Sequence, residues 1–110
     1  MADWREVAAG LGAEPVDPGV LKAAVKETLA LLQERAPGRS VEVRIPPFAA
    51  VQVVEGTTHR RGTPTAVVET DPETWLLLAA GHVAWADAVR TGRLRPSGER
   101  SDLSGLLPLP

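Results

Sequence analysis

The chain has 110 residues, a length typical of one domain with one modest core, and we expect residues 1–110 to form that single domain. Its 44% hydrophobic and 24% charged residues are ordinary for a globular protein and too apolar for a disordered tail. The 12 basic and 14 acidic residues give a net charge of −2, which argues against a protein that binds nucleic acid. The absence of cysteine excludes disulfides, thiolate zinc sites and cysteine nucleophiles.

Membrane and export signals are missing from the sequence. No apolar run approaches the roughly 18 residues that a membrane span needs, so we expect no integral membrane association. Residues 1–4 lack the basic start and apolar segment of a signal peptide, so we expect a cytoplasmic protein.

The first half of the chain predicts one or two helices. Asp3 is a candidate N-cap before apolar residues at helical spacing, and residues 1–16 are either a first helix or a loosely packed arm. The next helix is predicted over residues 18–35, because Asp17 is a good N-cap and proline suits the first helical position. One of its faces is apolar, formed by Leu21, Val25, Leu29 and Leu32.

Four strands are predicted by alternation and by strand-forming residues. They lie at residues 41–48, 50–55, 66–70 and 93–95, with a polar loop over 57–65. Pro46 and Pro47 interrupt the first of them, which indicates an edge strand or a bulged strand.

Three short helices are predicted in the second half, at residues 72–80, 83–91 and 101–107. Asp71 caps the first of these and Gly81 ends it in a left-handed turn, while Ser101 is the candidate cap of the last. Strands grouped together, rather than alternating with helices, predict an α+β fold with helices packed on one face of a largely antiparallel sheet.

Catalytic and metal-binding patterns are weak. The two histidines, His59 and His82, have no converging ligands in the sequence, and no serine lies in a nucleophile elbow. Glu69 and Asp71 are the best carboxylate pair, but a helix cap at Asp71 and an ion pair of Glu69 with Arg60 or Arg61 explain them better. We therefore predict no enzyme, no metal and no cofactor.

Two arginine-rich segments remain open to more than one interpretation. In the loop, Arg60 or Arg61 either holds the head group of an acidic ligand or ties the loop to a carboxylate. The four arginines between residues 90 and 100 either attract an anionic surface or, diluted by acids, form a solvated mixed face.

The apolar second half is the more informative feature. Residues 75–78 (WLLL) make a helix that is apolar nearly all round, and four leucines follow between residues 103 and 109. Such a helix is buried on more than one side, which indicates an apolar ligand cavity, a partner surface, or a helix sandwiched between the sheet and the C-terminal segment.

These segments resemble the sterol carrier protein family. Residues 70–81 (TDPETWLLLAAG), 88–98 and 103–108 follow the order of the C-terminal half of that fold, and 44–52 (RIPPFAAVQ) with 59–64 (HRRGTP) are similar to its small bacterial branch, found mostly in actinobacteria. The resemblance covers residues 17–108. It implies an α+β sandwich of about five mostly antiparallel strands with a tunnel between sheet and helices, in which animal members bind fatty acyl chains and sterols without catalysis.

Carried over by position, the resemblance implies a set of tunnel-lining residues and a polar rim. The lining residues are Phe48, Val53, Trp75, Leu78, Trp85, Val89, Leu103, Leu106 and Leu107, and the rim residues are His59, Arg61 and Glu69. The predicted function is non-catalytic binding of a fatty acyl or sterol-like ligand. The alternative is an accessory or interaction domain with a filled core, for which a homodimer is one candidate arrangement.

Overall fold

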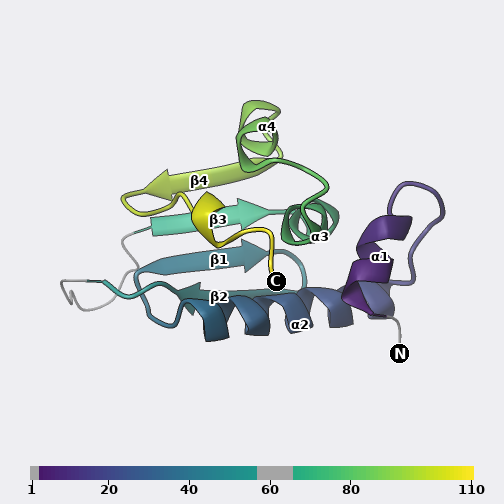
Figure 1. The fold of residues 1–110 in the computed structure, drawn as a ribbon, viewed down its shortest axis with the longest axis horizontal. Coiled ribbons are helices and arrows are strands. Elements are labelled where there is room, and N and C mark those ends of the chain that lie inside the picture. Colours follow the sequence, from purple (N-terminus) through teal and green to yellow (C-terminus); the bar gives the residue numbers. More distant parts are fainter. Residues whose placement is uncertain (1–2, 57–65) are drawn as a thin grey trace.

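The computed structural model describes residues 3–56 and 66–110 and shows a layer of helices against one sheet (Figure 1). In chain order the elements are α1 (Trp4–Gly10), α2 (Pro18–Arg35), β1 (Val41–Ile45), β2 (Ala49–Val53), β3 (Ala66–Thr70), α3 (Pro72–Ala80), α4 (Trp85–Arg90), β4 (Leu94–Gly98) and the short 3-10 helix η1 (Ser104–Leu106). The α+β class is confirmed.

The two main helices begin where their capping residues dictate. The Asp17 carboxylate accepts hydrogen bonds from the backbone N–H groups of Gly19 and Val20 at the start of α2. The Asp71 carboxylate accepts from the Thr74 N–H at 2.9 Å and from the Thr74 hydroxyl at 2.7 Å at the start of α3. Gly81 then ends α3 with a left-handed φ of 81°, a conformation that costs glycine nothing.

The sheet has the strand order β2-β1-β3-β4. β1 pairs antiparallel with β2 and parallel with β3, and β3 pairs antiparallel with β4. The described part of the chain thus holds four strands where the family resemblance implied about five, and the sheet is mixed.

The predictions for the first and last strands need correction. β1 lies inside the sheet, not at its edge, because the strand ends at Ile45 and the two prolines fall in the turn before β2. β4 runs through Pro96 to Gly98, beyond the expected residue 95. It tolerates Pro96 because it is an edge strand, paired only with β3.

Alternation along the strands gives the sheet two unlike faces. Side chains on the face under the helices are apolar and buried: Val41, Val43, Ile45, Val53, Ala66, Val68 and Leu94. On the other face Arg44 pairs with Glu42, and Arg95 pairs with Glu69 at 2.7 Å. The buried side chains of the strands therefore all face the helical layer.

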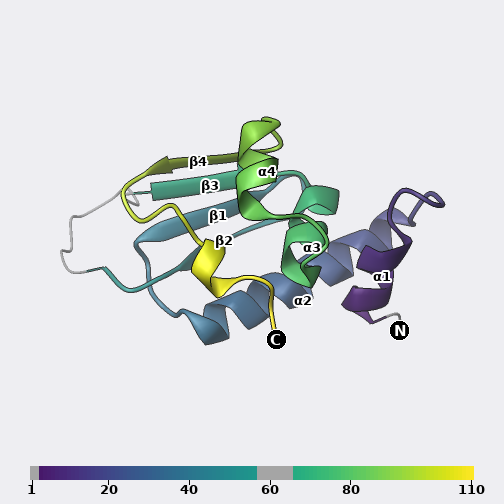
Figure 2. The ribbon, with the colours of Figure 1, turned by 45° about the horizontal axis from the view of Figure 1, so that its top comes forward.

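The helical layer is built from α2 and α3, with α1 packed against both (Figure 2). α2 lies along β2, α3 follows β3, and α4 packs against β4. For residues 1–16 the structure has the helix, since Trp4–Gly10 form α1 and its Trp4, Val7 and Ala8 are buried.

The predicted helix over residues 101–107 is wrong. Only Ser104–Leu106 form a helical turn, and Ser101 does not cap it, because the Ser101 hydroxyl donates to the Gly98 carbonyl oxygen at 2.8 Å. The chain then runs over the helical face, where the Leu109 N–H donates to the Ala79 carbonyl oxygen at 2.9 Å. We call residues 101–110 the C-terminal strap; it crosses in front of β3 and β1 in Figure 1.

Candidate functional site

Trp75 lies at the centre of the helical layer and is 1% exposed. Its indole N–H donates to the Thr28 hydroxyl oxygen on α2 at 2.8 Å. That hydroxyl in turn donates toward the carbonyl oxygens of Ala24 and Val25, at 2.8 and 2.9 Å. The ring is thus fixed in orientation as well as buried, because its polar atom has a partner inside the core.

The structure places the nine predicted lining residues at three depths. Val53, Trp75, Leu78 and Leu103 are fully buried members of one core. Phe48, Trp85, Leu106 and Leu107 are half-buried and pack on the margin of that core. Val89 is 38% exposed on α4.

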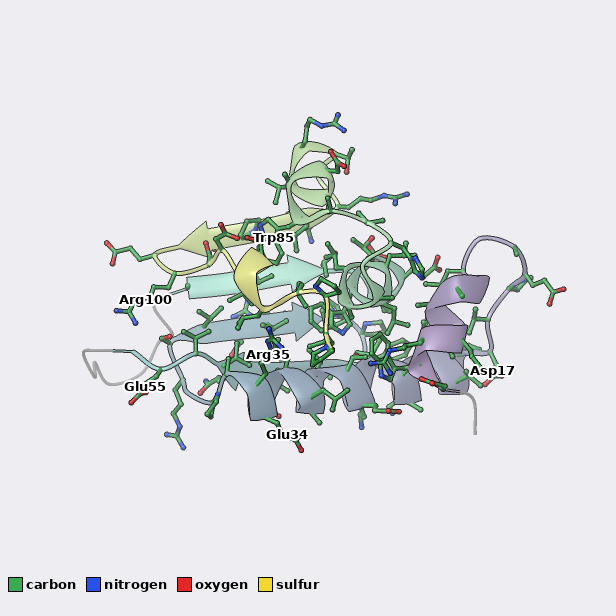
Figure 3. All side chains as sticks on the ribbon, in the orientation of Figure 1. Asp17, Glu34, Arg35, Glu55, Trp85 and Arg100 are labelled. Carbon is green, nitrogen blue, oxygen red and sulfur yellow. The ribbon has the colours of Figure 1, made fainter. Side chains whose placement is uncertain are left out.

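Trp85 is an example of a residue at the margin of the core. It is half-buried and lies where α4 meets β4, as labelled in Figure 3. The four fully buried members come from β2, from α3 and from the C-terminal strap, so elements far apart in sequence meet at one place. These buried side chains belong to one continuous core formed by the sheet, the helices and the strap.

The predicted polar rim is not gathered in the described residues. His59 and Arg61 lie outside them. Glu69 lies on the sheet face away from the helices, where its carboxylate accepts from the Arg95 guanidinium at 2.7 Å. Its expected partner was Arg60 or Arg61, which also lie outside the described residues.

Glu69 and Asp71 bind different partners and do not act as a carboxylate pair. Asp71 caps α3, as predicted, while Glu69 is held by Arg95 on the outer face. His82, just after α3, is exposed. Over residues 3–56 and 66–110, no group of three or more histidine and acidic side chains is placed to hold a metal ion.

Sequence reasoning missed a polar hollow of about 450 Å³ beside edge strand β2. It is lined by Gln33, Gly38, Arg39, Glu42, Ala50, Val51 and Gln52, and by none of the nine predicted residues. The Gln33 side-chain amide reaches across it to the Gln52 carbonyl oxygen at 3.4 Å. No sequence motif marks this hollow, because its residues come from the end of α2, the following turn and two strands.

A second unpredicted feature is a strained junction after β2. Val54 has a φ of 66°, which is unusual for a β-branched residue. Its carbonyl oxygen accepts from the Ser40 N–H at 3.0 Å and from the Ser40 hydroxyl at 2.7 Å, and its own N–H donates to Ala36 at 2.8 Å. Next to it the Arg100 guanidinium donates to the Glu55 carbonyl oxygen at 2.8 Å, at the same end of the sheet (Figure 3).

The fold and the apolar helical layer agree with what sequence comparison finds. A family model described as a bacterial SCP (sterol carrier protein) ortholog matches residues 17–109. No protein with a curated description matches the chain. None of the helices in the described residues is both long enough and apolar enough to span a membrane.

Proposed function

The chain belongs to the bacterial SCP ortholog family, and from this premise we propose that it binds a small apolar ligand without catalysing a reaction on it. The ligand class is a fatty acyl chain or a sterol-like lipid. The observation that carries the proposal is the one-sided core, in which every buried strand residue faces the helices and the strap. Burial in such a space is the main source of affinity for an apolar chain.

The margin of the core is the part of this space that can most easily rearrange to accommodate a ligand. Leu106 and Leu107 are half-buried on the strap, which has only one short helical turn. Moving such side chains costs less than moving Trp75, which is anchored by its hydrogen bond to Thr28. We therefore propose that Phe48, Trp85, Leu106 and Leu107 shift to make room for the ligand, which then contacts Val53, Leu78 and Leu103 beneath them.

The first experiment is native mass spectrometry of the purified protein, followed by denaturing extraction of whatever is bound. A co-purifying acyl or sterol species supports the carrier and identifies its ligand class. A titration with the fluorescent fatty acid cis-parinaric acid then gives the affinity. A native mass equal to that of the protein alone, together with no binding of the fluorescent probe, would contradict the proposal.

A pair of variants tests the location. Leu106→Gln places an amide at the margin of the core, and we expect it to weaken probe binding by about fivefold, as for a partly buried leucine. Val20→Gln makes the same kind of change at a residue that is 39% exposed on α2, and we expect no effect. Equal affinities of the two variants for the probe would show that the ligand binds elsewhere.

One observation favours the second candidate, an accessory domain with a filled core. The Trp75 ring is fully buried and hydrogen-bonded at the centre of the layer, as in a finished core. In that case the exposed edge of β2 or the strap faces a partner, a second copy of the chain being one candidate. The native mass spectrum separates the two functions, because it reports oligomeric state and bound ligand together.

A further inference from the structure

The family match begins at residue 17, so it leaves α1 outside the common fold. Yet α1 is no loose appendage, since Trp4 is 2% exposed and Val7 and Ala8 are buried with it. These side chains pack against both α2 and α3. The matched region on its own would therefore leave an apolar groove open between those two helices.

The attachment of α1 is almost wholly apolar. In the described part of the chain, one hydrogen bond joins α1 to another element, from the Arg5 guanidinium to the Pro110 carbonyl oxygen of the strap. The same guanidinium stacks over the Trp4 ring, 4.5 Å from its centroid. Residues 12–15, which lead from α1 toward α2, are all exposed.

An element held in this way can be replaced by a ligand of the same chemistry. The seven residues of α1 are too few to form a stable helix alone, so its order depends on docking. An acyl chain offers the same kind of contact as the indole ring and the valine, and needs no buried polar partner. Release of α1 sacrifices one exposed hydrogen bond and no buried ion pair among the described residues.

We infer that the groove between α2 and α3, now filled by Trp4, Val7 and Ala8, is the entrance of the ligand site, and that α1 is its displaceable stopper. The occupant is a single acyl chain, which takes the place of the Trp4 ring when α1 swings out on its exposed connection. This inference rests on the proposed carrier function and deepens it, by naming the route and the element that controls access. The observed affinity is then the intrinsic affinity multiplied by the fraction of molecules with α1 displaced.

Two substitutions in the full chain shift that fraction in opposite directions. A Cβ added at Gly10, the last residue of α1, meets nothing within 4 Å, so Gly10→Ala strengthens the helix without a clash. We expect it to raise thermal stability and to weaken cis-parinaric acid binding by about three- to fivefold. Trp4→Ala removes the buried ring, and we expect at least about tenfold tighter binding. Glu27→Ala, an exposed helix-favouring change on α2, is the matched control with unchanged affinity.

The outcomes separate this inference from the function on which it rests. If the natural chain binds the probe but Gly10→Ala binds equally well while being more heat-stable, α1 is a fixed part of the fold and the inference is overturned. If Trp4→Ala fails to fold, the Gly10→Ala result still decides. If neither the natural chain nor any variant takes up the probe, the carrier function itself fails, and the stopper with it.

Discussion

At the scale of single residues, Thr28 and Trp75 form a hydrogen bond across the core that no pattern in the sequence marks. The threonine reads as one more member of the α2 face, and Trp75 as one more large ring. Only the packing of α2 against α3 brings the hydroxyl within 2.8 Å of the indole nitrogen. Long-range polar pairs of this kind depend on tertiary placement, which residue spacing within one helix does not encode.

Thr28→Val tests this pair. Valine keeps the shape but leaves the buried indole N–H without an acceptor, so we expect a loss of about 1–3 kcal/mol in the free energy of unfolding. Urea titration followed by circular dichroism measures it. Thr28→Ser, which keeps the hydroxyl, is the control and should lose less. A Thr28→Val protein as stable as the Ser variant would show that the N–H finds another partner.

Gly38 is a residue whose role comes from the fold around it. Its φ is 149°, and an added Cβ would lie 2.1 Å from the Val54 carbonyl oxygen, where the backbone itself must shift. We expect Gly38→Ala to cost about 2–4 kcal/mol in unfolding free energy. The matched change Gly10→Ala, in open space, should stabilise in the same urea assay. A mild effect at Gly38 would mean that the junction after β2 is easily rearranged.

At the scale of elements, the sequence predicts best where local chemistry decides the outcome. The bounds of α2, α3 and β3 follow from Asp17, Asp71 and the strand-forming valines of residues 66–70, and the structure confirms them. It predicts worst where long-range contacts decide. Leucines in the strap are spaced as in a helix, but the strap is held extended by the hydrogen bond from Leu109 to Ala79 on α3. The hydrogen bond between Arg5 of α1 and Pro110 could not be predicted either, because the two residues lie at opposite ends of the sequence.

The strap contains an acidic residue, Asp102, whose pKa is shifted in the folded protein. Hydrogen bonds from the side chain and the backbone N–H of Ser104 lower the pKa of Asp102 below its ordinary value. A lowered folded-state pKa stabilises the fold above the unfolded pKa, and this contribution is lost as pH falls through the folded value. We expect Asp102→Asn to reduce the loss of stability between about pH 5 and pH 2 in urea titrations. Glu99→Gln controls for the removed charge, and equal slopes in both variants would contradict the role of Ser104.

At the scale of the whole molecule, the sheet has one face covered by helices and one face without them. Alternate residues of a strand are therefore buried on the first face or more exposed on the second. The fold class and this alternation could be predicted from the sequence. The parallel pairing of β1 with β3, the position of β1 inside the sheet and the filling of the helical side by Trp75 could not, because they depend on how separate segments meet.

Neighbouring valines in β3 test the sidedness directly. Val68 is buried under the helices, and Val67 is half-buried on the outer face. We expect Val68→Thr to lower the free energy of unfolding by about 1–3 kcal/mol, because it buries a hydroxyl that has no hydrogen-bond partner in place. We expect Val67→Thr to be nearly neutral. Thermal unfolding of both variants measures the difference. Equal losses would show that the outer face is covered in solution.

The mixed pairing of β1 also has a consequence for the order in which the chain folds. The β1–β2 hairpin closes a short turn, whereas the parallel ladder of β1 with β3 joins segments that lie further apart in the sequence. Local pairing is reached faster than non-local pairing, so we expect the β1–β2 hairpin to form by the rate-limiting step and α1 to dock after it. In stopped-flow experiments, weakening the hairpin should slow refolding, whereas weakening the α1 contact should leave refolding unchanged and speed unfolding.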